Sequence, residues 1–140
     1  MLKAYLAIKY HADLSNRCRI ETLTAALRSV GVEVFCVARD LEDWGARCFA
    51  PRDLMHASLQ ALLACDLVLV DLSEKGVGIG IEAGYAHAHR KPLAVTVPHI
   101  EDLSTTLAGI ADVVLIAGDP QELAEQLRPF LARLTGPIAT

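Results

Sequence analysis

The sequence predicts a single doubly wound α/β domain, in which helices flank a mostly parallel five-stranded sheet. Short apolar runs alternate with helix-patterned segments five times along the 140 residues, and no repeat or linker interrupts them. The run from Leu67 to Leu72 is almost wholly apolar, as in a strand buried on both faces of a parallel sheet. A hydrophobic fraction of 53% suffices for one substantial core, so residues 1–140 are expected to form one domain.

The expected strands are residues 3–8, 32–37, 67–72, 93–97 and 113–116, and the expected helices are residues 17–30, 54–65, 78–89, 104–111 and 120–135. Ser15 or Asn16 can cap the first helix, and Gly31 can end it. The next connection, from Ala38 to Pro51, holds the only tryptophan, Trp44. Connections of this length in compact domains are usually functional or mobile.

The second half of the chain carries clear helix boundaries. Ser104 can cap the short fourth helix. Asp119 and Pro120 begin the last helix with a capping carboxylate and a proline in the first turn. Pro129 is expected to kink that helix, and Gly136-Pro137 to end it.

In a sheet of this Rossmann-like or flavodoxin-like kind, ligands bind at the carboxyl ends of the strands, near a switch in strand order. The loops at residues 9–16, 39–44 and 73–78 are therefore expected to face one pocket. This expectation follows from the fold class alone.

The third strand leads through a glycine-bearing loop into a helix expected to start at Gly78 or Ile79. Glu82 then falls in the first turn, where the helix dipole favours an ionised carboxylate that could act as a nucleophile. Gly76 and Gly78 leave the backbone bare enough for a ligand to approach closely. Two other interpretations stay open: an acidic residue that only suits the dipole, and a dinucleotide fingerprint, because residues 78–83 match G-x-G-x-x-A.

The segment GVGIGIEAGYA, residues 76–86, resembles the nucleophile segment of the nucleoside 2-deoxyribosyltransferase-like family, which includes the 2'-deoxynucleoside 5'-phosphate N-hydrolases. In that family a glutamate in this context attacks the anomeric carbon of the sugar. The resemblance therefore implies that Glu82 is catalytic.

Lys9, Tyr10 and His11 follow the first strand, and Arg17 starts its helix. Two cations and a histidine beside a helix N-terminus could bind a phosphate; a solvated basic loop is the alternative. The resemblance implies phosphate binding by Lys9 and His11, which match the family's polar loop in place and polarity only.

The next loop holds Arg39, Asp40, Glu42, Asp43 and Trp44, and its aromatic ring near hydrogen-bonding carboxylates could stack on and read a nucleobase. A salt-bridged surface loop is the simpler alternative. Asp71, at the end of an apolar strand, could act in catalysis or bind a loop backbone. The hydroxyl of Tyr5 on the first strand could point into the pocket.

The resemblance extends to Ser104, since a serine in a similar segment of the nucleotide hydrolases reaches the phosphate of a neighbouring subunit; on sequence alone Ser104 is a helix cap. Ser58 departs from the family, which often has an aspartate there to orient the nucleophile or protonate the base. Asp53, His56 or a residue of the loop at 39–44 could replace that acid.

The net charge of −4 favours neither disorder nor a nucleic-acid-binding surface, and no apolar run approaches the roughly 20 residues that span a bilayer. The four cysteines form no C-x-x-C pair, so reduced thiols, a cytoplasmic location and no metal or other cofactor are expected. The family's shared sites imply a homodimer or larger homo-oligomer.

The sequence thus favours an enzyme that cleaves or transfers the N-glycosidic bond of a (deoxy)nucleoside or nucleoside 5'-monophosphate through Glu82. A non-catalytic nucleotide-binding module and an NAD glycohydrolase are the alternatives.

Overall fold

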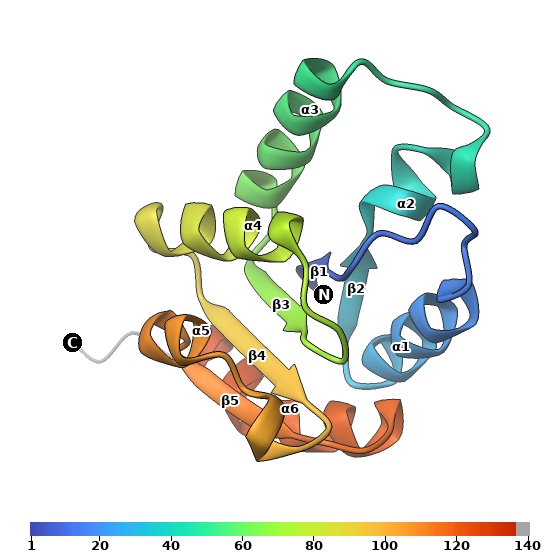
Figure 1. Ribbon diagram of the computed structural model, residues 1–140. Coiled ribbons are helices and arrows are strands. Elements are labelled where there is room, and N and C mark those ends of the chain that lie inside the picture. The colour runs from blue at the N-terminus through green and yellow to red at the C-terminus, as the bar shows by residue number, and fades with distance from the viewer. Residues whose placement is uncertain (137–140) are drawn as a thin grey trace.

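The computed structural model describes residues 1–136 and contains a five-stranded sheet in which all strands are parallel, in the order β2-β1-β3-β4-β5 (Figure 1). The strands are β1 (Leu2–Ala7), β2 (Val32–Phe35), β3 (Leu67–Asp71), β4 (Leu93–Val97) and β5 (Val113–Ile116). The helices are α1 (Arg17–Ser29), α2 (Val37–Asp40), α3 (Pro51–Ala64), α4 (Val77–Ala88), α5 (Thr105–Ile110) and α6 (Pro120–Thr135). Short 3-10 helices lie at Asp43–Gly45 and Ile100–Asp102. The predicted fold class is confirmed.

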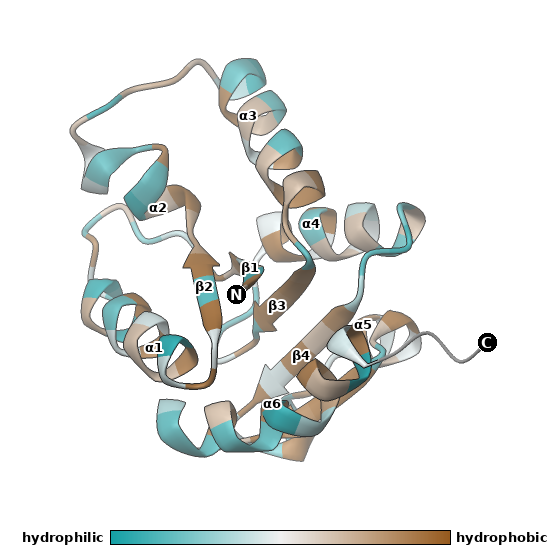
Figure 2. Cartoon of the chain, turned by 180° about the vertical axis from the view of Figure 1, so that it is seen from behind, coloured by the Kyte–Doolittle hydropathy of each residue, from teal (hydrophilic) through white to brown (hydrophobic). Residues whose placement is uncertain are grey.

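Helices cover both faces of the sheet, and an apolar cluster lies under each layer. The cluster under α1 and α6 contains Leu23 and Leu127, and the cluster under α3, α4 and α5 contains Leu62 and Ala83. Figure 2 shows the strands mostly in hydrophobic colours and the helices with mixed surfaces. Strands β3 and β4 are buried at every position, as their apolar sequences predict.

Strand β1 lies between β2 and β3, so the chain leaves β1 towards one edge of the sheet and later returns to its other side. This reversal is the switch point at which open α/β sheets bind ligands. The loops that follow β1 and β3 adjoin there.

Several element boundaries differ by one to three residues from the predicted ranges, and two of these differences affect the ligand-binding edge. β2 ends at Phe35, and the chain turns directly into α2, because the Asp40 carboxylate accepts a hydrogen bond from the Cys36 backbone N–H at 2.8 Å. Helix α4 begins at Val77, one or two residues earlier than expected. Both shifts change which side chains reach the ligand-binding edge.

The caps are partly as predicted. Asp119 caps α6 by accepting from the Glu122 N–H, and Gly31 adopts the left-handed conformation after α1 (φ 86°). Asn16 precedes α1, but its side-chain amide donates to the Lys9 carbonyl and forms no cap bond. Helix α6 continues through Pro129 and ends at Thr135, with Gly136 directly after it as predicted; Pro137 lies outside the described residues.

Within residues 1–136, no helix is long and apolar enough to cross a membrane.

Candidate active site

Two neighbouring cavities lie at the switch between β1 and β3, and Glu82 lines both of them. The larger has a volume of about 380 Å³ and extends beneath α2 and α3. The smaller, about 230 Å³, lies against the start of α4. Lys9 and Tyr10, which follow β1, line both cavities as well. The larger volume falls in the range of roughly 300–1,000 Å³ that is typical of small-molecule sites.

Glu82 is positioned by helix α4, whose buried face (Ile79, Ala83 and Ala86) packs on the sheet. The prediction that Glu82 lies in the first helical turn was wrong. Because α4 begins at Val77, the carboxylate stands in the second turn, beyond the reach of most of the dipole's effect.

The electrostatic environment of Glu82 also differs from the expectation of a fully ionised group. Burial raises the pKa of Glu82 to about 7, although the nearby Tyr5 hydroxyl counteracts this rise. Near neutral pH the side chain is therefore divided between the acid and the carboxylate.

Tyr5, on β1, is fully buried and stacks on Phe35 with ring centroids 5.6 Å apart. Its hydroxyl has no hydrogen-bond partner of good geometry within the described part of the chain. Burial raises the pKa of Tyr5 most, the charge of Glu82 raises it further, and Ser58 lowers it. Because both Ser58 and Glu82 act on the Tyr5 hydroxyl, the three side chains lie close together. Tyr5 is not among the residues that line either cavity, and its predicted reach into the pocket stays a prediction.

Ser58, on α3, lines the larger cavity and is 2% exposed. Its hydroxyl donates to the Leu54 carbonyl one helical turn earlier, at 2.7 Å. A serine bound in this way occupies the cavity wall without offering an acidic proton.

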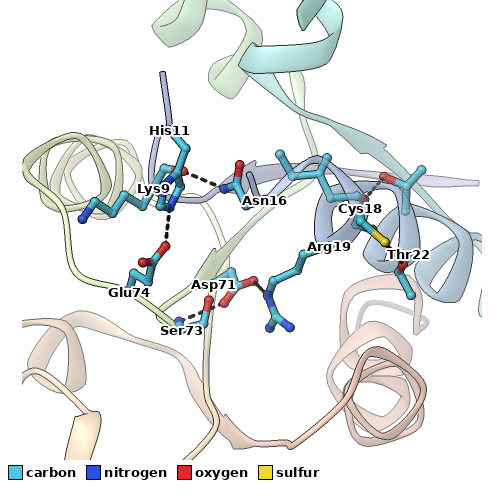
Figure 3. Close-up of polar contacts among 11 residues, drawn as sticks. Lys9, His11, Asn16, Cys18, Arg19, Thr22, Asp71, Ser73 and Glu74 are labelled. Carbon is cyan, nitrogen blue, oxygen red and sulfur yellow. Dashed lines mark hydrogen bonds and ion pairs between the residues drawn. The ribbon is translucent and has the colours of Figure 1, made fainter. Parts of the chain in front are cut away.

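Of the residues predicted to bind a phosphate, Lys9, Tyr10 and His11 line a cavity, but not all of them are free to contact a phosphate. Lys9 lines both cavities, and His11 lines the larger one. The His11 Nε2 contacts the Glu74 carboxylate, which joins the loop after β1 to the loop after β3 (Figure 3). Arg17 instead lies over the Trp44 ring, with its guanidinium carbon 4.4 Å from the ring centroid. A phosphate would therefore meet Lys9 directly and would compete with Glu74 for His11.

Asp71, at the end of β3, lies away from both cavities and is 1% exposed. Its two carboxylate oxygens accept hydrogen bonds from the Arg19 Nε at 2.6 Å and the Ser73 backbone N–H at 2.9 Å (Figure 3). These contacts match the predicted alternative of loop-backbone binding, and they bring no support for a catalytic role.

The prediction that Arg39, Asp40 and Trp44 face the same pocket was wrong. Because α2 starts right after β2, Arg39 and Asp40 turn to the edge of the sheet, where they pair with each other at 2.9 Å. Trp44 packs against the α1 side of the core. The residues of this region that line the larger cavity are Val37, Ala38 and Glu42. The sequence placed Glu42 only among the polar residues of the loop at 39–44, any of which could replace the acid missing at Ser58. The turn into α2 is what brings Glu42 to the cavity.

Gly76 and Gly78 lie at the smaller cavity, as predicted. A Cβ atom at Gly78 would stand 3.8 Å from the Glu82 Oε1. The dinucleotide fingerprint is excluded, because Gly78 and Gly80 are helical residues of α4 and form no phosphate-binding turn before it.

Ser104 caps α5 by accepting a hydrogen bond from the Leu107 N–H, and it lines neither cavity of this chain. Its predicted reach into a neighbouring subunit stays a prediction.

Comparison with known proteins shows which family the chain resembles. No family model matches the chain. A curated relative, the putative 2'-deoxynucleoside 5'-phosphate N-hydrolase 1 of Thermofilum pendens, is 27% identical over 137 residues, which cover 93% of this chain and 95% of that protein. The predicted resemblance is confirmed: this chain is similar to the nucleoside 2-deoxyribosyltransferase-like family.

Several solved structures share the fold of this chain. A CMP N-glycosidase from Clostridium botulinum has a TM-score of 0.67 at 22% identity, with 91% of this chain and 98% of that chain covered. A 2-deoxyribosyltransferase from Bacillus psychrosaccharolyticus has a TM-score of 0.62 at 18% identity, with 87% and 90% covered. A conserved protein from Enterococcus faecalis V583 has a TM-score of 0.73 at 16% identity, with 93% and 99% covered.

Proposed function

We propose that this chain cleaves or transfers the N-glycosidic bond of a nucleoside or nucleoside 5'-monophosphate, with Glu82 as the nucleophile. The observation that carries the proposal is the partly buried Glu82 carboxyl, which lies where two cavities meet at the sheet's switch point. The names of three similar proteins also support the N-glycosidic bond as the target. They are a 2'-deoxynucleoside 5'-phosphate N-hydrolase, a CMP N-glycosidase and a 2-deoxyribosyltransferase.

In the proposed reaction, the ionised Glu82 attacks the anomeric carbon, the carbon–nitrogen bond breaks, and the base departs with the bonding electron pair. The product is a glycosyl ester of Glu82. Water then attacks the same carbon and releases the sugar, or a second base does so and gives a new nucleoside. The Tyr5 hydroxyl beside Glu82 favours the ionised form that the first step needs.

The larger cavity, whose walls include Leu54, Met55 and Val37, suits the flat apolar faces of a nucleobase. Lys9, between the two cavities, suits a 5'-phosphate. His11 would join it once its contact with Glu74 opens. Ser104 of a second subunit would complete the phosphate site in a homo-oligomer.

One observation favours a second candidate, a non-catalytic nucleotide-binding module. Ser58 stands at the cavity wall with its hydroxyl already bound to the Leu54 carbonyl, so it supplies no acid for the departing base. Such a module would bind a nucleotide saturably and release no base.

The test is chromatographic detection of free base from a panel of nucleosides, nucleotides and NAD. The wild type is compared with Glu82→Ala and with Glu101→Ala, an exposed control. We expect base from the wild type and the control, and none from Glu82→Ala. If NAD is the one substrate from which a base, nicotinamide, is released, the protein is an NAD glycohydrolase. Equal turnover by Glu82→Ala would refute the proposed nucleophile, and calorimetric binding without any base release would favour the binding module.

A further inference from the structure

We propose that Glu42 is the general acid that protonates the departing base, an inference that rests on the proposed glycosidic cleavage. Glu42 and Glu82 line the same cavity of about 380 Å³ and come from different elements, the turn after α2 and helix α4. They are the two carboxyl groups among the residues lining that cavity.

A nucleobase that leaves a sugar carries the bonding electron pair on a ring nitrogen, so it departs as an anion unless a proton reaches it. A positioned acid typically contributes 10²–10⁴-fold to such a step. The proton donor has to face the cavity, and it has to hold a proton while Glu82 has none.

The other proton-bearing side chains that line this cavity suit the role less well. His11 is held by the Glu74 carboxylate. Lys9 and Tyr10 are exposed at the mouth, where a phosphate is expected. Cys36 is buried, and burial raises its pKa to about 11, which makes the thiol a poor proton donor.

Three further residues near this site are excluded by their positions. Asp53 and His56 lie on α3 but do not line the cavity. Asp40 accepts hydrogen bonds from Arg39 and from the Cys36 backbone N–H at the sheet edge.

Glu42 itself has the features of a donor. Its backbone is fixed by three hydrogen bonds: its N–H donates to the Val37 carbonyl, and its carbonyl accepts from Gly45 and Arg47. Within residues 1–136 its carboxyl group has no hydrogen-bond partner or ion pair, so it can turn to a ligand. Partial burial raises the pKa of the Glu42 carboxyl above its ordinary value.

Each carboxyl group then acts twice in one cycle, Glu82 as nucleophile and leaving group and Glu42 as acid and base. In the first step Glu82 forms a bond to the anomeric carbon, the bond to the base breaks, and the Glu42 proton moves to the base nitrogen. In the second step water attacks that carbon, the Glu82 ester bond breaks, and the proton lost by water returns to the Glu42 carboxylate. Atoms and charge balance over the cycle.

The experiment compares two kinds of leaving group in the wild type, Glu42→Gln and Asp43→Asn, an exposed neighbour outside the cavity. The first substrate is the best natural nucleoside or nucleotide from the panel. The second is the corresponding 4-nitrophenyl glycoside, whose leaving group departs as an anion without protonation. Glu42→Gln should lower kcat/KM for the natural substrate by about 10²-fold or more. It should leave the nitrophenyl substrate little changed, and Asp43→Asn should alter neither.

The alternative outcomes separate the two proposals. Glu42 is not the acid if Glu42→Gln leaves kcat/KM for the natural substrate unchanged. The same conclusion follows if the variant lowers kcat/KM for both substrates equally while its thermal unfolding matches that of the wild type. In either case the proposed function stands. If the wild type cleaves neither substrate, the proposed function fails, and this inference fails with it. If Glu42→Gln unfolds, Glu42→Asp replaces it, and the same ratio of the two substrates decides.

Discussion

The buried hydroxyl of Tyr5 on β1 lies beside the carboxyl group of Glu82 on α4, and each group shifts the pKa of the other. The Glu82 charge raises the pKa of Tyr5, whereas the Tyr5 hydroxyl lowers the pKa of Glu82. Only an ionised carboxylate can act as a nucleophile, so under the proposed function Tyr5 would set the fraction of protein in which Glu82 can react.

Removal of that hydroxyl should make Glu82 harder to ionise. In Tyr5→Phe, the pKa of Glu82 should rise above its wild-type value of about 7, because the group that lowers it is lost. The acidic limb of the pH–rate profile should then move to higher pH, and activity at pH 7 should fall more than activity at pH 9. The profile of kcat/KM against pH measures this shift. Tyr85 lies on the same helix as Glu82 but lines neither cavity, so Tyr85→Phe should leave the acidic limb of the pH–rate profile in place. An unmoved limb in Tyr5→Phe would contradict the pairing.

The raised pKa of Glu82 should also destabilise the folded protein at alkaline pH. The folded pKa of about 7 exceeds the model-peptide value of 4.5, so the folded state binds more protons than the unfolded state between these values. Stability from this group is therefore complete below pH 4.5 and is lost as pH rises through 7. The side chain in Glu82→Gln carries no charge at any pH. At pH 8 the free energy of unfolding of this variant should therefore exceed that of the wild type by an amount on the order of 2 kcal/mol.

Urea unfolding at several pH values checks this prediction. The difference between Glu82→Gln and the wild type should vanish near pH 4 and grow through neutral pH. Glu101→Gln, at an exposed position, should give no such trend. A constant difference at all pH values would mean that packing, and not ionisation, distinguishes the two proteins.

Asp71 should matter for stability. Asp71→Ala removes a 1%-exposed carboxylate that binds Arg19 and the Ser73 N–H. The free energy of unfolding should fall by about 3 kcal/mol, because both partners lose a buried acceptor. Glu125→Ala, which removes an exposed ion pair with Arg128, should change the free energy of unfolding far less, because water screens that pair. Chemical denaturation measures both, and equal effects would show that the Asp71 contacts contribute little.

Two glycines of α4 allow an effect on helix stability to be distinguished from an effect on substrate access to Glu82. Gly78→Ala and Gly80→Ala should each stabilise the helix by about 0.5–1 kcal/mol, because alanine loses less backbone entropy on folding. The added methyl group at Gly78 would lie 3.8 Å from the Glu82 Oε1, whereas at Gly80 it meets nothing within 4 Å. Turnover should therefore fall in Gly78→Ala alone. Thermal unfolding and base release measure the two effects, and equal turnover in both variants would exclude close substrate approach at Gly78.

Local patterns in the sequence determined the sheet. The apolar runs that became β4 and β5 have the predicted bounds, and Asp119 caps α6 as expected. These features depend on neighbouring residues in the chain, so a sequence pattern contains them. The same holds for Glu82, whose glycine-rich context marks it without any knowledge of its surroundings.

The sequence by itself determined the fold class and the segment that carries the site, while only the tertiary structure decided which side chains meet there. Turning from β2 directly into α2 takes Arg39 and Asp40 to the sheet edge and leaves Glu42 at the cavity. Burial between β1, α3 and α4, and not the helix dipole, sets the pKa of Glu82. Desolvation and side-chain direction depend on residues far apart in the chain, so no local pattern could reveal them.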